Sequence, residues 1–279
     1  MSQARPSGIP PMMPCWVTGH LGGRMARVLI TGSTAGLGRA AARQLLDGGH
    51  EVVLHARNSG RAGSVDDLAR RAAGVVVGDL ASADETRGVA DQVNAIGGVD
   101  AVIHNAAVYV DPRRVVTPEG HARTLAVNVL APYLLTAWIN RPSRQVYLSS
   151  GMHNDGDASL RDIDWTARRW NGVQAYCDSK LFITALALAV ARRWPDLRAH
   201  AVDPGWVPTR MGGPGAPDDL ELGSLTQTWL AVSDDPEATG SGGYWYHQRR
   251  RSPARAALDE SFQAALLDEL VRLTEVRLP

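Results

Sequence analysis

Several features that would direct an interpretation are missing from this 279-residue sequence. Two cysteines support neither a disulfide framework nor a metal-ligand spacing. The 29 basic and 29 acidic residues cancel, which removes the long-range field that a general nucleic-acid binder needs. No run approaches ~18 consecutive apolar residues, the length of a membrane-spanning helix. We therefore expect no metal site, no nucleic-acid partner and no membrane span.

The N-terminal segment also lacks the continuous apolar stretch of a signal peptide. Prolines and glycines are frequent there, and Met25 directly precedes the first predicted strand. Residues 1–25 are therefore predicted to be a disordered extension, or sequence upstream of the true start, and residues 26–279 to be a single domain. Without a targeting signal, the default location is cytoplasmic.

From Arg27 onward, short β-branched runs alternate with amphipathic stretches of helical length. This alternation predicts an α/β fold, a doubly wound and mostly parallel sheet with helices on both faces. Strands are expected over residues 27–32, 51–56, 74–78, 99–105, 144–150, 197–205 and 243–247. Helices are expected over residues 39–46, 118–138 and 173–193, with capping-box spacings at Ser64 and Ser82 predicting two more helix starts. Residues 151–172 are predicted to be an exposed loop, 211–218 a mobile segment and 249–251 a solvated turn.

A glycine cluster, ITGSTAGLGRA, joins the first predicted strand to the first helix. Glycines there permit a tight turn and let the backbone approach a pyrophosphate at the helix N-terminus, where free N–H groups favour an anion. Gly32, Gly36 and Gly38 have the spacing G-x-x-x-G-x-G, not the G-x-G-x-x-G of the two-half dinucleotide fold. Such glycines also occur in plain connecting turns, but a first βα turn favours a nucleotide.

The end of the second predicted strand indicates which nucleotide would bind. An acidic residue there holds the ribose hydroxyls of NAD, whereas a cation accommodates the 2′-phosphate of NADP. The strand ends in LHARN, with Arg57 and no adjacent acidic residue. The planar guanidinium suits a phosphate, so NADP(H) is preferred and NAD(H) remains an option. A surface arginine without a ligand is the alternative.

Tyr176 and Lys180, in QAYCDSKLF, are four residues apart on a predicted helix and so point to one face. A free phenol, with a pKa of ~10, transfers protons poorly at neutral pH. A neighbouring ammonium favours the phenolate and lowers that pKa. Many solvated helix faces share this spacing, so the pair gains weight only from the motifs around it.

The order of the motifs resembles that of the short-chain dehydrogenase/reductase family over about Arg27 to His247. The segments that match are TGSTAGLG, HNAA, VNVLAPYLL, YLSS, YCDSK and DPGWVPT. His104 and Ala107 depart from the family's usual residues. The long segment before Tyr176 is similar to the retinol-dehydrogenase-like and WW-domain-oxidoreductase-like branch.

The resemblance implies a single-domain Rossmann fold and an oxidoreductase that transfers hydride between NADP(H) and a small, apolar carbonyl or alcohol. Tyr176 would be the general acid or base, and Lys180 would lower its pKa and hold the nicotinamide ribose. Ser150, with Ser149 as its rival, would hydrogen-bond the substrate oxygen. Asn128 would hold a water that relays protons. The implied cofactor contacts are Gly32, Ser33, Thr34, Gly36, Leu37, Gly38, Arg57, Asp79, Leu80, Asn105, Ala106, Tyr176, Lys180, Pro204, Gly205, Val207 and Thr209.

Several other side chains have two interpretations. His104 is predicted to be a packed strand-end residue and Cys177 a buried structural one, rather than a catalyst or a redox switch. Four tryptophans could line an apolar substrate pocket or pack in the core: Trp165, Trp170, Trp206 and Trp229.

Two other functions compete with the oxidoreductase. The first is a sensor or scaffold protein that binds NADP without turnover. The second is a sugar-nucleotide epimerase or dehydratase, which would need a larger C-terminal domain than the residues after Thr209 provide. Family members often pair through the long helices around the active site, so a homo-oligomer is a further expectation.

Overall fold

One sheet organises the computed structural model, which describes residues 25–63 and 66–279. Its strand order is β3-β2-β1-β4-β5-β6-β7-β8, and all neighbours are parallel except β7 and β8. The order reverses between β1 and β4, the place where ligands bind in open sheets of this kind. The strands are β1 (Arg27–Ile30), β2 (Glu51–Ala56), β3 (Gly74–Val77), β4 (Ala101–His104), β5 (Arg144–Leu148), β6 (Arg198–Asp203), β7 (Gly243–Tyr246) and β8 (Arg249–Arg251).

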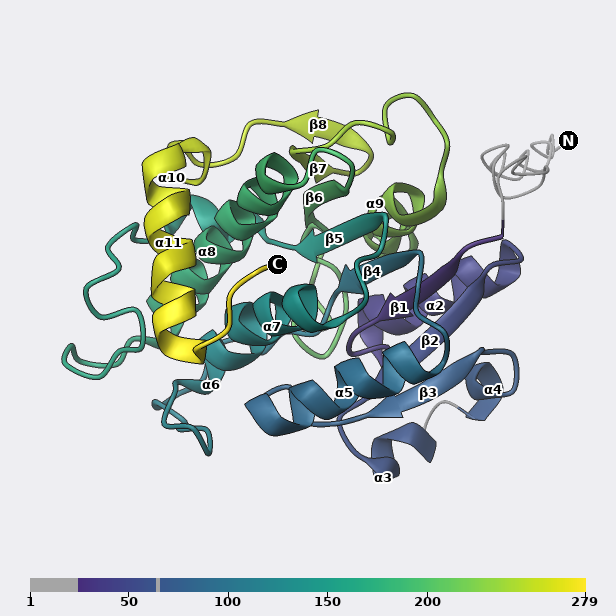
Figure 1. The fold of residues 1–279 in the computed structure, drawn as a ribbon, viewed down its shortest axis with the longest axis horizontal. Helices are drawn as coiled ribbons and strands as arrows, with labels where there is room; N and C mark the ends of the chain where they lie inside the picture. Colours follow the sequence, from purple (N-terminus) through teal and green to yellow (C-terminus); the bar gives the residue numbers. More distant parts are fainter. Residues whose placement is uncertain (1–24, 64–65) are drawn as a thin grey trace, which may run out of the picture.

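Helices cover both faces of this sheet (Figure 1). Helices α2 and α9 pack on one face, and α5, α7 and α8 on the other. The helices are α2 (Gly36–Asp47), α3 (Ser59–Ala62), α4 (Asp66–Ala69), α5 (Ala83–Ala95), α6 (Arg123–Leu125), the π-helix η2 (Ala126–Leu130), α7 (Ala131–Trp138), the 3-10 helix η3 (Gly151–Asp155), α8 (Gly172–Arg193), α9 (Leu220–Val232), α10 (Arg255–Leu258) and α11 (Glu260–Thr274). The α/β fold with a mostly parallel, doubly wound sheet is confirmed.

The strands are apolar along their whole length because both of their faces are buried. In β1, Val28 and Ile30 pack in the cluster under α2 and α9, whereas Leu29 packs under α5 and α7. This is the pattern of a parallel sheet covered on two sides. Packing on both faces fixes the positions of the strand ends relative to one another. The loops that follow the carboxyl ends of the strands form the site.

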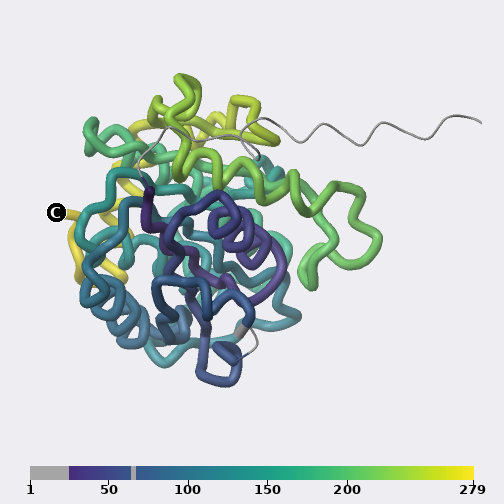
Figure 2. Tube along the Cα trace, turned by 90° about the vertical axis from the view of Figure 1, so that its right-hand side faces the viewer, coloured from purple at the N-terminus to yellow at the C-terminus, as the bar shows by residue number. Residues whose placement is uncertain are grey.

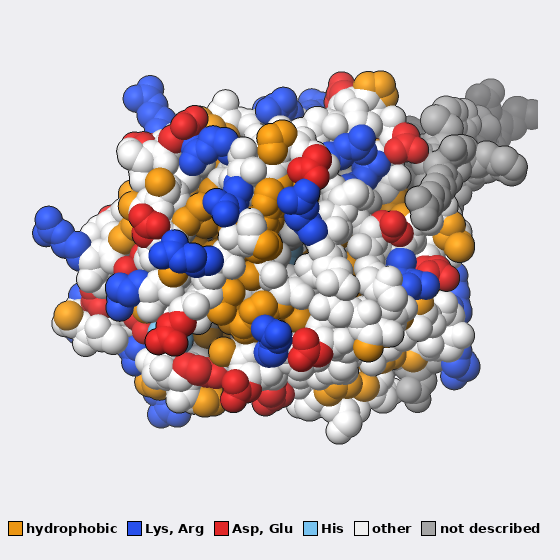
Figure 3. Space-filling view, viewed as in Figure 1, with side chains coloured by type: hydrophobic (Ala, Val, Ile, Leu, Met, Phe, Trp, Pro, Cys, Tyr) orange, Lys and Arg blue, Asp and Glu red, His pale blue; other side chains and the backbone are white. Residues whose placement is uncertain are grey.

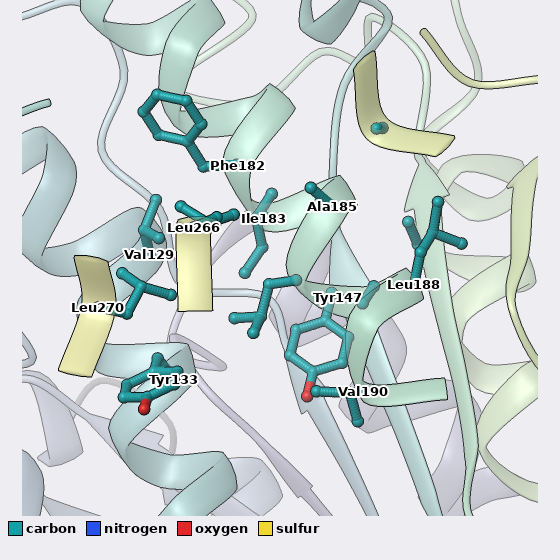
Figure 4. Packing of buried hydrophobic residues seen from close by; sticks show 14 of the residues in the cluster. Val129, Tyr133, Tyr147, Phe182, Ile183, Ala185, Leu188, Val190, Leu266 and Leu270 are labelled. Atoms are coloured by element: carbon teal, nitrogen blue, oxygen red, sulfur yellow. The ribbon is translucent and has the colours of Figure 1, made fainter. Parts of the chain in front are cut away.

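Helix α8 lies in the largest apolar cluster, and Leu266 and Leu270 of α11 pack into the same cluster (Figure 4). Leu266 and Leu270 of α11 are fully buried there, and the Tyr133 hydroxyl donates to the Val276 carbonyl at 2.6 Å. Among the described residues, α8 is the one helix long and apolar enough to cross a membrane, but 89% of its most apolar window is buried inside the protein. It is therefore accounted for as a core helix.

The structure corrects two predicted segments. The helix expected from residue 118 begins at Arg123, because residues 117–122 form a turn in which the Thr117 N–H donates to the His121 carbonyl at 2.8 Å. It then runs through η2 into α7. The segment Arg249–Arg251, expected to be a solvated turn, is the exposed edge strand β8.

The structure confirms some of the predicted helix starts and adds helices that were not predicted. The Ser82 side chain caps α5 by accepting from the Glu85 N–H, as predicted. Ser64 and the N-terminal extension lie outside the described residues, apart from Met25. The helices that were not predicted are α3, η3, α9, α10 and α11, and η3 lies at the start of the segment predicted to be an exposed loop.

Candidate active site

A cleft of about 490 Å³ opens at the carboxyl ends of the central strands. It brings together most of the predicted residues: Gly32, Thr34, Gly36, Leu37, Gly38, Arg57, Asp79, Leu80, Asn105, Ala106, Tyr176, Lys180, Pro204 and Thr209. Its lining also contains residues that were not predicted as contacts: Ala35, His55, Arg61, Ala107, Val108, Val127, Leu148, Arg210 and Met211. Of the predicted site residues, Ser33, Asn128, Ser150, Gly205 and Val207 are not in that lining.

The glycine turn has the backbone that its residues predict. Gly32 and Gly36 have φ values of +66° and +54°, which disfavour a side chain. A β-carbon at Gly38 would lie 2.5 Å from the Asn105 side-chain nitrogen. Ala35, which precedes α2, provides no side-chain cap. The first N–H groups of α2 therefore have no side-chain partner and lie at the cleft, where a phosphate group would fit.

Hydrogen bonds join this turn to the end of β4. The Thr31 hydroxyl oxygen accepts from the N–H groups of Asn105 and Ala106, both at 2.9 Å. The Asn105 side-chain amide donates to the Thr31 carbonyl at 2.8 Å. The predicted asparagine thus holds two loops of the cleft together.

His55 joins the same turn to β2 and accounts for the position of Ser33. The His55 Nδ1 accepts from the Gly32 N–H at 2.9 Å, and Nε2 is 2.9 Å from the Gly78 carbonyl. The Ser33 hydroxyl accepts from the His55 N–H at 2.8 Å and is fully buried. The Ser33 side chain therefore supports the turn from behind, and its predicted contact with the cofactor stays a prediction. Sequence reasoning missed His55, although it is two residues before Arg57.

The cleft has an excess of positive charge in a chain with none overall. Arg57, Arg61 and Arg210 lie in its lining together with Lys180, and Asp79 is the acidic residue among the described residues there. Arg57 is exposed at the end of β2, as expected. This distribution favours an anionic ligand.

Tyr176 is buried on α8, with 5% of its surface exposed. Burial raises the pKa of the Tyr176 phenol well above its ordinary value, while a hydrogen bond with the Ser150 side chain acts in the opposite direction. The expected lowering of the Tyr176 pKa by Lys180 is not seen. The Lys180 Nζ is 5.5 Å from the centre of the tyrosine ring, and it donates to the Leu148 carbonyl at 2.8 Å.

The buried Lys180 is itself perturbed. Burial lowers its pKa to about 8, and the Asp203 carboxylate acts in the opposite direction. The amine therefore changes charge about one pH unit above neutrality, much closer to it than an exposed lysine would.

The structure distinguishes the two candidate serines. The Ser149 hydroxyl lies 2.7 Å from the Thr184 hydroxyl and is buried, although Ser149 contributes to the cleft lining. The Ser150 side chain forms the hydrogen bond with Tyr176. This geometry favours Ser150 as the partner of the phenol.

Asn128 lies in the π-helix η2, a helix type that is frequent at functional sites. Its side-chain oxygen accepts from the Val108 N–H at 2.8 Å. Its amide donates to the Val108 carbonyl and to the Ser179 hydroxyl, both at 3.0 Å. The side chain therefore fixes the segment after β4 against α8, one residue before Lys180.

Two loops form one wall beside Tyr176. Tyr109 packs edge-on against the Tyr176 ring, with centres 4.8 Å apart, and is 41% exposed. Its loop is tied to residues 151–172 by Asp164, which accepts from the Ala122 N–H and from the His121 ring at 2.8 Å. The Trp170 indole donates to the Asp111 carbonyl at 2.9 Å.

The opposite wall is the segment between β6 and α9, which stands out from the body of the molecule (Figure 2). It approaches the glycine turn at one point, since a β-carbon on Gly36 would lie 3.3 Å from Thr209. Met211 lies in the cleft lining and is 39% exposed.

None of the four tryptophans lines the cleft. Trp165 and Trp229 are buried, Trp170 packs edge-on against Trp165 at 5.5 Å, and Trp206 is 60% exposed. Core packing is therefore the correct interpretation for Trp165 and Trp229.

The predictions for His104 and Cys177 are confirmed. His104 is buried, bonds to the Gln145 side chain at 2.9 Å and stacks on Tyr147. Cys177 is buried, and burial raises the pKa of its thiol.

A second hollow of about 190 Å³ lies between α5, α7 and the end of α11. Its floor includes Leu130, Leu134 and Trp138, and apolar side chains show in the middle of this face in Figure 3. It is smaller than ordinary ligand pockets and lacks a catalytic constellation.

Comparison with known proteins identifies the family. A family model described as Enoyl-(Acyl carrier protein) reductase matches residues 32–237. The chain belongs to the short-chain dehydrogenase/reductase family. It is 42% identical to the short-chain dehydrogenase chry4 of Gibberella zeae over 91% of this chain and 99% of that protein. As a member of this family it is an oxidoreductase.

Two further likenesses agree with the branch and the fold. Retinol dehydrogenase 13 of Homo sapiens is 29% identical, over 90% of this chain and 85% of that protein. A crystal structure of a putative uncharacterized protein from Mycobacterium paratuberculosis is 28% identical, with a TM-score of 0.78, covering 91% of this chain and 95% of that one. The resemblance to retinol dehydrogenases is thus confirmed at the level of sequence.

Proposed function

We propose that this oxidoreductase uses NADP(H) and interconverts a small, apolar carbonyl compound with its alcohol. One observation carries the proposal: Tyr176 and Lys180 line the same cleft as the glycine turn and Arg57. Proton-transfer groups and an anion-binding end are thus parts of a single site.

The residues present fit a dinucleotide phosphate. The N-terminus of α2 has no side-chain cap and lies at the cleft, so its N–H groups suit the pyrophosphate. Arg57 and Arg61 suit the 2′-phosphate, and Asp79 and Leu80 would border the adenine. When bound, the cofactor supplies or accepts a hydride at its nicotinamide ring.

Tyr176 moves the proton. Because burial raises the pKa of its phenol, the hydroxyl stays protonated at neutral pH and can donate to a carbonyl oxygen. Ser150 hydrogen-bonds the phenol and would bond the same oxygen as charge develops. Lys180, held by the Leu148 carbonyl, would stabilise the phenolate that remains.

The same electrostatics favours carbonyl reduction as the reaction seen at neutral pH. Alcohol oxidation needs the phenolate as base, which the buried site disfavours. Reduction starts from the phenol, the form that is already populated. We therefore infer that oxidation requires a higher pH than reduction.

The walls beside Tyr176 suit an apolar substrate. Val108 and Met211 line the cleft, and Tyr109, which packs edge-on against Tyr176, is 41% exposed. The name of retinol dehydrogenase 13 gives that relative an apolar alcohol as substrate.

The test is NADPH consumption measured with a panel of apolar aldehydes and ketones, in parallel with NADPH binding. Turnover with at least one of them supports the proposal. Tight NADPH binding with no turnover on any carbonyl or alcohol would instead favour a sensor or scaffold protein.

A further inference from the structure

A buried histidine, His153, lies directly behind Ser150 and has no part in the chemistry described so far. It is 1% exposed and belongs to η3, which begins after Ser150. Its Nδ1 is 2.8 Å from the Ser150 carbonyl oxygen, and its Nε2 accepts from the Ala254 N–H at 2.9 Å. The ring therefore connects the turn after β5 to the segment that leads into α10.

These two partners leave one arrangement of protons on the ring. A backbone N–H can only donate, so Nε2 must carry a lone pair. A carbonyl oxygen can only accept, so Nδ1 must carry the proton. Burial lowers the pKa of His153, opposed by the bond to the Ser150 carbonyl, and this agrees with a neutral ring.

A third group prevents the ring from turning. Tyr244 of β7 packs on His153 with ring centres 4.6 Å apart. Its hydroxyl lies 3.4 Å from the His153 Nδ1 and can accept from the same ring N–H. The imidazole is therefore fixed in position as well as in tautomer.

We propose that His153 is the positioning residue of Ser150, acting through its N–H bond to the Ser150 carbonyl. This rests on the proposed function, because Ser150 matters only if Tyr176 transfers a proton. Ser150 is extended, with φ −168° and ψ 154°, and its hydroxyl oxygen also accepts from the Met152 N–H at 3.3 Å. The same carbonyl also accepts from the His153 backbone N–H at 3.0 Å, so the ring is its second donor. Without the ring, the carbonyl would lose its 2.8 Å bond and its tie to the Ala254 segment, and the hydroxyl could move relative to the phenol.

Two substitutions separate the two bonds of the ring. His153→Asn places an amide N–H near the position of Nδ1 and keeps a donor for the Ser150 carbonyl, but it does not reach Ala254. His153→Gln places its amide oxygen near Nε2 and keeps the acceptor for Ala254, but it removes the side-chain donor and leaves the Ser150 carbonyl with the backbone N–H of residue 153 and the Ser149 hydroxyl. Both remove the same ring, so both lose similar packing against Tyr244.

The measurements are kcat and KM for the carbonyl substrate, the NADPH dissociation constant and the melting temperature. We expect kcat of His153→Gln to fall roughly tenfold or more, because small misplacements of a reacting group are costly, while NADPH affinity stays as in the wild type. His153→Asn should recover most of kcat, with a similar loss of melting temperature. Equal kcat losses in the two variants, or none in His153→Gln, would overturn the proposal.

The tautomer can be checked in the wild-type protein, which does not depend on the variants folding well. Nitrogen NMR of the histidine-labelled protein, with the His153 signals assigned by their loss in either variant or by through-bond connectivity, shows which ring nitrogen carries the proton. A proton on Nδ1 is expected, and a proton on Nε2 would overturn the proposal. Absence of turnover in the wild type would count against the proposed function instead. The tautomer of His153 could still be determined in that case.

Discussion

Single side chains decide whether the cleft catalyses or only binds. Tyr176→Phe removes one oxygen atom from a ring that Tyr109 already packs against. We expect NADPH to bind as in the wild type and turnover to fall by about 10²-fold to 10⁴-fold, the contribution of general acid catalysis. Fluorescence titration and steady-state rates measure the two effects, and a variant retaining more than a tenth of the activity would contradict the role of Tyr176.

Arg57 should determine which nucleotide is preferred. Arg57→Ala is expected to weaken NADPH binding by about tenfold or more, because a charge-assisted bond to the 2′-phosphate is lost, and to leave NADH binding unchanged. Arg70→Ala, an exposed arginine outside the cleft lining, is the matched control. Equal loss for both nucleotides would assign Arg57 to another part of the cofactor.

Lys180 should destabilise the protein without cofactor near neutral pH. Its pKa of about 8 in the folded state is below the ~10.4 of an unfolded lysine, so the unfolded chain binds more protons between these values. Stability from this group therefore rises as pH increases from 8 toward 10.4. Lys180→Met should be more stable than the wild type at pH 7, by on the order of 2 kcal/mol, and this advantage should shrink over that window.

Melting curves of both proteins between pH 7 and pH 10.5 give the difference directly. A constant difference across the range would mean that burial does not perturb Lys180. The comparison between the two proteins cancels the other groups that titrate in the same window.

At the scale of secondary elements, the start of α8 depends on a close approach. A β-carbon on Gly172 would lie 2.2 Å from the Asp111 carbonyl oxygen, so Gly172→Ala must push the two loops of the wall apart. We expect a loss of about 1–3 kcal/mol in unfolding free energy. The control is Gly88→Ala in α5, where nothing lies within 4 Å, which should gain about 0.5–1 kcal/mol. Denaturant titrations would contradict this account if the two substitutions had the same sign.

The sequence predicted the elements whose signal is local. All the expected strands are present. They could be recognised because a strand buried on both faces is a continuous apolar run, as around Val28 and Val53. The helix before α7 was extended too far because the turn at Thr117 depends on hydrogen bonds that its composition does not reveal.

The unpredicted helices have different explanations. In α9, polar side chains such as Ser224, Gln227 and Thr228 are buried, so the helix has no clear polar face and its period is hidden. In α11, the four-residue spacing of Leu266 and Leu270 was a usable signal that was not used.

The site also contains residues that could be predicted from the sequence and residues that could not. Strand-end residues such as Asn105 and Asp79 were implied by the family resemblance, and they line one cleft because parallel strands bring their carboxyl ends to one edge. Arg61 and Arg210 could not, because the direction of a loop side chain depends on the conformation of the whole loop. The direction of the Tyr176 pKa shift was also missed, since burial is a property of the fold and not of the four-residue spacing.

For the whole molecule, the position of α11 bears on self-association. The homo-oligomer expected from the family would pair the long helices around the active site, but α11 of the same chain packs on α8, with Leu266 and Leu270 buried in their shared cluster (Figure 4). We therefore expect a monomer at micromolar concentrations, measured by light scattering after gel filtration. A dimer with cross-links between the α8 helices of two chains would show that α11 can leave this face.

The joined loops beside Tyr176 also have a consequence for how the range of substrates can change over evolutionary time. Asp164 and Trp170 form hydrogen bonds that join residues 107–122 to residues 151–172. A substitution that moves the backbone of one loop therefore also moves the other loop. The segment between β6 and α9 forms hydrogen bonds within itself, such as that from the Trp206 indole to the Gly212 carbonyl at 2.8 Å, and it stands apart from the body of the fold (Figure 2). New specificities should therefore accumulate first around Met211, where single changes are tolerated, and only later in the loop of Tyr109, where they must come in compensating pairs.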